Sequence, residues 1–147
     1  MKTYIKMVLA LPEKFFEKWE WKRGDIALYS DGSHNFKPDS LSLICLGDKN
    51  HKSFLFENGK LGYYKRGDFY EVDRIIKPIP SQKQLQKICM DIIQCSPQDL
   101  LKFFEAWLYE DEIRPVVDFE DFDDLWLRYT VWVWSRLEWN GEKWKEA

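Results

Sequence analysis

The residues most able to do chemistry are few and stand far apart in the sequence. Neither histidine, His34 or His51, is accompanied by a serine or cysteine nucleophile pattern. The cysteines are Cys45, Cys89 and Cys95, and no set of residues around them has the spacing of a zinc site. The sequence also has no glycine-rich phosphate loop, dinucleotide fingerprint or H-E-x-x-H helix. It therefore predicts no catalytic, cofactor-binding or metal-binding residues, and we expect a protein that is not an enzyme.

Acidic residues form the strongest electrostatic feature of the chain. They gather between residues 110 and 124, as Glu110, Asp111, Glu112, Asp118, Glu120, Asp121, Asp123 and Asp124. Acids in the first turn of a helix are stabilised by its positive end, and Asp121 is a candidate helix cap. The alternatives are a cation site, although a calcium loop would need a glycine that this stretch lacks, and an acidic surface for a basic partner.

One pattern of five residues occurs twice. Residues 21–25 and 64–68 both read aromatic-Lys-Arg-Gly-Asp, and both precede a predicted strand. Glycine supplies unusual backbone angles and aspartate can bond its own backbone two residues on, so we expect two turns at strand entries. An adhesive Arg-Gly-Asp motif would need a secreted protein, which nothing in the sequence supports. A third alternative is that the basic residues, Lys22, Arg23, Lys65 and Arg66, cluster around an anion.

Strands are expected to dominate residues 1–80. They are predicted over Thr3–Leu9, Ile26–Tyr29, Leu41–Leu46, Ser53–Glu57, Lys60–Tyr64 and Phe69–Ile76. Asn58-Gly59 favours a type I′ hairpin between two of these strands, and the last is expected to stop before Pro78. A short helix is predicted over Pro12–Trp19. Cys45 lies in one of the apolar runs and is expected to be a small core residue.

From residue 81 the apolar period changes to that of helices. Ser81 and Gln84 fit a capping box, and Cys89 lies on the apolar stripe of the helix that follows. Ser96 and Pro97 open a second helix, predicted to end near Tyr109.

The third and longest helix is predicted over Phe119–Trp139, ending at Asn140-Gly141, and it holds the aromatic residues around which the chain is expected to pack. Leu127, Val131 and Trp134 form a second apolar stripe opposite its main one. A helix that is apolar on two sides is either sandwiched within its own fold or offers its second side to another chain. These three residues are therefore the candidate protein interface.

The chain as a whole is expected to be one α+β domain, residues 1–147, with a small antiparallel sheet of hairpins followed by three helices. Its 147 residues are 45% hydrophobic and 17% aromatic, and its formal net charge is −3. This charge makes nucleic acid an unexpected partner for the whole protein, although the first eighty residues carry an excess of basic residues. The three cysteines without a pairing pattern fit a reducing cytoplasm, and no segment is apolar for the roughly 18 residues of a membrane span.

Four short segments resemble a known group of proteins. They are Phe16-Glu17-Lys18-Trp19, residues 79–86 (IPSQKQLQ), residues 124–127 (DLWL) and residues 139–144 (WNGEKW). The chain is similar here to small uncharacterised proteins encoded by bacteriophages, prophages and other mobile elements, and it departs from them in a longer middle, residues 31–68. The group has no assigned activity, so the resemblance implies no catalytic residue. It implies a cytoplasmic protein of a bacterial host or its phage.

We therefore expect a non-enzymatic accessory protein that acts by protein-protein contact, either with an unknown partner or with itself. The alternative is a nucleic-acid-associated protein that uses the basic, aromatic sheet half. In that case Lys65 and Arg66 would contact phosphates while Tyr64 and Tyr70, with their neighbours Tyr63 and Phe69, would form a stacking platform.

Overall fold

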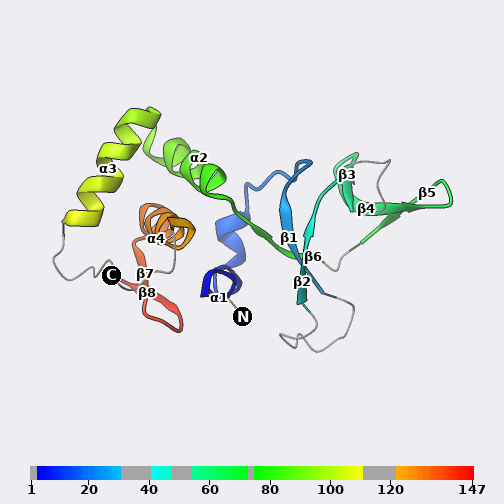
Figure 1. The fold of residues 1–147 in the computed structure, drawn as a ribbon, viewed down its shortest axis with the longest axis horizontal. Helices are drawn as coiled ribbons and strands as arrows, with labels where there is room; N and C mark the ends of the chain where they lie inside the picture. Colours follow the sequence, from blue (N-terminus) through cyan, green and yellow to red (C-terminus); the bar gives the residue numbers. More distant parts are fainter. Residues whose placement is uncertain (1–2, 31–40, 48–53, 73–74, 111–121) are drawn as a thin grey trace. The chain divides into compact units, whose positions relative to one another are not determined.

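The computed structural model describes residues 3–30, 41–47, 54–72, 75–110 and 122–147 (Figure 1). The chain divides into two compact units. The helical unit comprises Met1–Leu11 and Pro80–Ala147, and the sheet unit comprises Pro12–Ile79. This boundary coincides with the change from strands to helices that the sequence predicts at residue 80. The α+β class is confirmed, whereas the assignment of a single domain stays a prediction.

The sheet unit contains two antiparallel sheets of three strands among its described residues. The first has the order β2-β1-β6 and the second the order β3-β4-β5. The strands are β1 (Ile26–Ser30), β2 (Leu41–Cys45), β3 (Leu55–Glu57), β4 (Lys60–Lys65), β5 (Asp68–Glu71) and β6 (Ile75–Ile79). Neighbours in sequence pair as β1 with β2, β3 with β4, and β4 with β5, whereas β6 pairs with the distant β1.

The predicted turns are found, and glycine explains them. Asn58 and Gly59 both have positive φ (51° and 78°), as a type I′ turn requires, and they join β3 to β4. Arg66 and Gly67 have the same feature between β4 and β5. In the first copy of the repeated pattern only Gly24 has positive φ, and the Asp25 N–H donates to the Lys22 carbonyl. Both copies are therefore turns, but of different types.

Three predictions for the first eighty residues are wrong. Thr3–Leu9 is a helix, α1, because its buried residues Met7 and Val8, together with Leu11, share one helical face. The helix expected over Pro12–Trp19 is a single 3-10 turn, η1 (Glu13–Phe16). The strand expected over Phe69–Ile76 is two strands, β5 and β6, and β6 runs through Pro78, which is tolerated because β6 is the edge strand of its sheet.

The second and third helices of the helical unit begin as their capping signals predict. In α2 (Gln82–Ile93) the Ser81 hydroxyl accepts from the Gln84 N–H, while the Gln84 side chain accepts from the Ser81 N–H. In α3 (Pro97–Tyr109) the Ser96 hydroxyl accepts from the Asp99 N–H.

The last helix is shorter than predicted. α4 spans Phe122–Ser135, Arg136 turns left-handed (φ 55°), and the chain continues as a hairpin, β7 (Leu137–Trp139) and β8 (Trp144–Glu146). The Asn140 side chain accepts from two backbone N–H groups in the hairpin turn. Trp139 and Trp144 face each other across the strands, with ring centroids 5.3 Å apart. Asn140-Gly141 thus turns a hairpin instead of ending the helix.

The core of the helical unit is built on α4, as predicted. Leu125, Trp126 and Tyr129 are almost fully buried. The Phe104 ring of α3 stacks on Trp126 at 4.0 Å, and its edge meets the Tyr129 ring. α2 and α1 also contact α4, so the helix is covered from more than one side. Aromatic rings therefore supply much of the packing in this unit.

Candidate functional site

The predicted interface stripe on α4 is mostly internal. Leu127 and Val131 have no exposed surface, and Trp134 is half-buried. The expectation that these residues offer an exposed surface to a partner is wrong for Leu127 and Val131. A helix that is apolar on two sides is either sandwiched within its own fold or offers one side to another chain. The burial of Leu127 and Val131 supports the first explanation for α4. Any partner surface must be found elsewhere.

A groove on the helical unit is the first candidate that the structure adds. It encloses about 460 Å³ between the ends of three helices, and we call it the helical groove. Its lining residues are Ile92 and Ile93 of α2, Phe103, Ala106 and Trp107 of α3 with the adjoining Glu110, and Tyr129, Trp132 and Val133 of α4 with the adjoining Arg136. The four α3-side residues follow helical spacing, so they form one continuous wall.

The groove has an apolar floor and one charge of each sign. Tyr129 and Trp107 are buried beneath it with ring centroids 5.1 Å apart. Burial raises the pKa of Tyr129 to about 12, so its hydroxyl is neutral at physiological pH. The Arg136 guanidinium lies 3.8 Å from the Trp132 ring centroid and donates to the Trp132 carbonyl. The groove can therefore hold apolar side chains.

Two large apolar side chains of this groove are exposed. Ile92 keeps 44% and Phe103 keeps 47% of its surface accessible. Both lie on helix faces whose apolar period is typical of buried stripes. Periodicity shows which residues share a face, but it does not show how far the neighbouring helix extends over it. That is why this site was missed.

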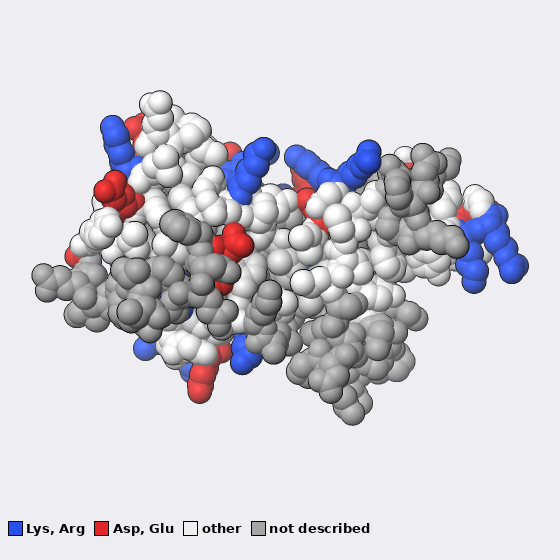
Figure 2. All heavy atoms as spheres, in the orientation of Figure 1, with Lys and Arg blue, Asp and Glu red and all other residues white. Residues whose placement is uncertain are grey.

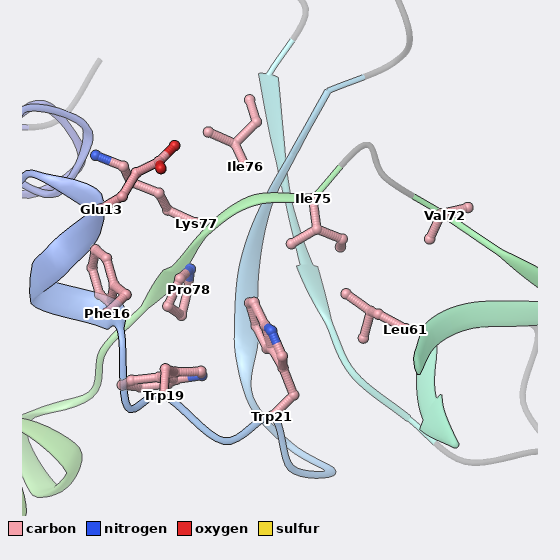
Figure 3. Close-up of a pocket in the computed structure, with 10 residues that line it drawn as sticks. All are labelled: Glu13, Phe16, Trp19, Trp21, Leu61, Val72, Ile75, Ile76, Lys77 and Pro78. Atoms are coloured by element: carbon pink, nitrogen blue, oxygen red, sulfur yellow. The ribbon is translucent and has the colours of Figure 1, made fainter. Parts of the chain in front are cut away.

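A second candidate is a cleft in the sheet unit, which we call the tryptophan cleft (Figure 3). Its volume is about 320 Å³. Its lining residues are Glu13 and Phe16 of η1, Trp19 and Trp21 of the following segment, Leu61 of β4, Val72, and Ile75, Ile76, Lys77 and Pro78 of β6. No sequence motif marked it, because these residues come from separate stretches of the chain, 13–21, 61 and 72–78, that only the fold brings together.

The polar groups of the tryptophan cleft are few. Glu13 and Lys77 lie side by side at its η1 end (Figure 3). Burial lowers the pKa of the Lys77 amine, and the nearby Glu13 carboxylate opposes this shift. The indole nitrogen of Trp19 is buried, and no hydrogen-bond acceptor meets it among the described residues. The cleft is therefore mainly an aromatic and aliphatic surface with one unmet donor.

The predicted nucleic-acid residues do not form one platform. Tyr64 and Tyr70 lie on opposite faces of the β4–β5 hairpin, because Tyr63 pairs with Tyr70 and Tyr64 pairs with Phe69. The Tyr64 hydroxyl donates to Glu57, and this hydrogen bond is the main cause of its raised pKa. The prediction that all these rings share a stacking surface is wrong.

Part of that site survives on one face of the hairpin. Tyr63 and Tyr70 stack with ring centroids 5.7 Å apart, and Tyr70 is 47% exposed. Phe54 and Tyr29 extend this row of rings, with centroid separations of 5.9 Å and 4.8 Å. Lys65 and Arg66 are exposed at the turn of the hairpin, and Figure 2 shows basic side chains gathered at that end.

The remaining sequence candidates are settled only in part. Asp25 is 5% exposed and its carboxylate accepts from the Lys22 N–H. The first Arg-Gly-Asp segment therefore stabilises its own turn. Cys89 is fully buried, as predicted, whereas Cys45 is exposed and its assignment to the core is wrong. His34, His51 and residues 111–121 of the acidic stretch lie outside the described residues. Within the part that is described, no group of three or more His, Cys, Asp or Glu residues could hold a metal ion.

Comparisons with known proteins provide no relative. No family model, curated protein or solved structure matches this chain. None of the described helices is long and apolar enough to cross a membrane.

Proposed function

We propose that this chain is an accessory protein that works by binding another protein through the helical groove, and that it is not an enzyme. The observation that carries the proposal is the pair of exposed apolar side chains, Ile92 and Phe103, above a floor of buried rings. Large apolar surface that is open at the mouth of a groove is typical of protein interaction sites.

The shape of the groove favours an apolar helix face as the bound element. Its α3 wall, from Phe103 to Glu110, spans two helical turns, or roughly 10 Å at 1.5 Å per residue. Amphipathic helices bind such grooves through apolar anchors spaced three and four residues apart. Arg136 and Glu110 are the charged lining residues, and they would set the orientation of a partner more than its affinity.

The cellular setting is part of the same proposal. The resemblance of four short segments to uncharacterised proteins of phages, prophages and mobile elements supports a role in a bacterial cytoplasm. The partner would then be a protein of the host or of the mobile element, or a second copy of this chain.

The test uses two exposed residues of the same helix. Phe103 lies in the groove, whereas Leu101, which is 57% exposed, does not line it. If the partner is a second copy of the chain, we expect Phe103→Glu to abolish the self-association seen in sedimentation velocity. If the partner is a host protein, we expect the same substitution to abolish its capture by the purified chain. Leu101→Glu should leave either unchanged. Equal effects of the two substitutions, with both variants folded by circular dichroism, would refute the groove as the binding site.

A second function is supported by the row of stacked rings in the sheet unit. Tyr63 and Tyr70 share their face of β4 and β5 with Lys65, so bases could stack beside a cation. We expect binding of single-stranded nucleic acid to weaken steeply with salt and to be lost in Lys65→Glu with Arg66→Glu. Absence of binding at low salt would eliminate this function and leave the first untouched.

A further inference from the structure

The tryptophan cleft presents aromatic surface in a defined arrangement. The rings of Phe16 and Trp19 lie 6.1 Å apart at 79°, and those of Trp19 and Trp21 lie 6.2 Å apart at 72°. Neighbouring rings are thus nearly perpendicular, and an occupant meets ring edges and ring faces in turn. Aliphatic side chains from β4 and β6 close the other side (Figure 3). The cleft is suited to flat, apolar groups.

Backbone pairing is not the mode of recognition that this cleft offers. β6, which contributes four consecutive residues to the cleft, is the edge strand of its sheet. Pro78 lies within it and has no N–H to give to an added strand, and proline is one of the devices that protect sheet edges from such pairing. An added strand would lose a backbone hydrogen bond at this position, which leaves the rings as the main recognition surface.

The hydrogen-bonding groups of the cleft further restrict which occupant can bind. The Trp19 indole N–H is buried and meets no acceptor among the described residues, so an occupant whose carbonyl reached it would satisfy a donor that the protein leaves unmet. Figure 3 shows this nitrogen on the side of the ring nearest Trp21. Apart from Glu13, the lining side chains offer no acceptor. An ordinary peptide would lose water from its N–H groups there without replacing those bonds.

We propose that the tryptophan cleft binds a proline-containing peptide segment in the polyproline II conformation. Proline residues carry carbonyl acceptors without N–H donors, and their compact apolar pyrrolidine rings pack against aromatic side chains. Such segments are known to bind aromatic-lined grooves, because the extended conformation is already formed before binding. The inference concerns a different unit from the helical groove and does not depend on the function proposed there.

A nucleobase is a poorer occupant by charge. Its phosphate would need a cation at the cleft, and the cationic lining residue, Lys77, stands next to the Glu13 carboxylate. A phosphate at this end would meet one attractive and one repulsive charge at similar distance. A thymidine oligonucleotide is therefore expected to bind more weakly than a proline peptide.

The experiment titrates the full-length protein with a blocked deca-proline peptide and follows the indole N–H resonances by NMR. The Trp19 signal is assigned by its loss in Trp19→Phe. There are three controls: a glycine-serine decapeptide, the same glycine-serine decapeptide with one residue replaced by phenylalanine, and a thymidine oligonucleotide. We expect saturable binding of the proline peptide alone, with the Trp19 resonance among those that shift.

Three variants locate the binding. Trp19→Phe keeps an aromatic ring but removes the donor, and we expect affinity to fall about three- to tenfold. Trp21→Ala should weaken binding more than about tenfold. Leu43→Ser changes a 51% exposed apolar residue that does not line the cleft and should bind as the unchanged protein does. If Trp21→Ala fails to fold, Trp19→Phe decides alone.

The proposal is overturned if the proline peptide shifts no indole resonance at millimolar concentration. It is equally overturned if the phenylalanine peptide or the oligonucleotide binds as tightly, or if folded Trp19→Phe binds with unchanged affinity. Binding limited to the proline peptide and weakened by Trp19→Phe supports it.

Discussion

At the scale of single residues, Gly62 is the position where the sheet unit tolerates no side chain. A Cβ atom there would collide with the Tyr70 carbonyl and would lie 2.7 Å from the Phe69 ring. Backbone cannot move aside as a flexible side chain can, so we expect Gly62→Ala to destabilise the sheet unit by about 1 to 3 kcal/mol. The change in the free energy of unfolding is measured by urea unfolding, with amide hydrogen exchange in β4 and β5 as the probe. Lys60→Ala, an exposed change in the same strand, should stay within about 0.5 kcal/mol of the original, and equal effects of the two would contradict the prediction.

Cys89 is the residue through which the helical unit should respond to alkaline pH. Burial raises the pKa of its thiol from the usual 9.0 to about 11, while the thiol donates to the Thr130 hydroxyl at 3.2 Å. Between pH 9 and pH 11 the unfolded chain has released this proton and the folded chain has kept it, so the free energy of unfolding falls as pH rises. The loss should approach roughly 2 to 3 kcal/mol at about 1.4 kcal/mol per pKa unit.

The measurement is the urea midpoint at pH 8 and at pH 10.5. Cys89→Ala should be less stable at pH 8 but should show a flatter pH dependence, while Cys45→Ala, which removes an exposed thiol, should keep the original slope. A slope that Cys89→Ala leaves intact would assign the effect to other groups. Tyr129, whose pKa is raised to about 12 mainly by burial, acts in the same direction at higher pH.

The same two cysteines show what single residues reveal before a structure is known. Cys89 was predicted correctly because it lies on a helical stripe whose period is unambiguous. Cys45 was not, because a short apolar run gives no indication of which face is covered. Alternation along β2 places Cys45 on the same face as Leu43, and both are exposed.

At the scale of elements, the signals that act within four residues were the reliable ones. The capping box of α2, the serine cap of α3 and the Asn-Gly hairpin turn depend on hydrogen bonds or backbone angles that a short segment makes by itself. The prediction for Thr3–Leu9 failed because a seven-residue segment of mainly apolar and β-branched residues fits a strand or a helix equally well. Only its contact with the distant α4 decides. The end of α4 failed in the same way, since Trp139 pairs with Trp144 across a hairpin.

The cap of α2 allows a direct test at this scale. The Ser81 hydroxyl accepts from the Gln84 N–H at 3.2 Å, and the reciprocal bond from the Ser81 N–H is 2.9 Å long. Ser81→Ala removes the first of these, and we expect a loss of about 1 kcal/mol in the free energy of unfolding. Lys83→Ala, an exposed change in the same helical turn, should cost nothing measurable. Thermal unfolding that shows no difference between the two variants would mean that the cap is not formed in solution.

At the scale of the whole molecule, the sequence indicated the change from strands to helices at residue 80 but not the discontinuity of the helical unit. The change is visible because the apolar period shifts from two to 3.6. The discontinuity is not, since it rests on contacts between residues 76 and 137 positions apart. The Trp144 indole N–H donates to the Met7 carbonyl at 2.9 Å, and the Tyr4 hydroxyl donates to the Pro80 carbonyl. The tryptophan cleft was missed for the same reason, because its lining residues run from Glu13 to Pro78.

This organisation predicts that residues 1–11 stabilise residues 80–147 and not the strands that follow residue 11. Met7, Val8 and Leu11 are at most 2% exposed. Burying one such side chain contributes about 1.5 to 3 kcal/mol, so removing all three takes away roughly 5 kcal/mol or more, which is comparable with the stability of a whole domain. Deletion of residues 1–11 should therefore abolish amide protection in α2 and α4 and the near-ultraviolet dichroism of their packed rings. Protection in β1 and β4 should persist.

The full-length variant Met7→Asp provides the matched control, because it keeps the chain length while placing a charge where no water reaches. It should reproduce the loss in α2 and α4. Hydrogen exchange that instead shows β1 losing its protection before α4, in either variant, would mean that the amino-terminal helix supports the strands that follow it. The division of the chain into these two units would then be wrong.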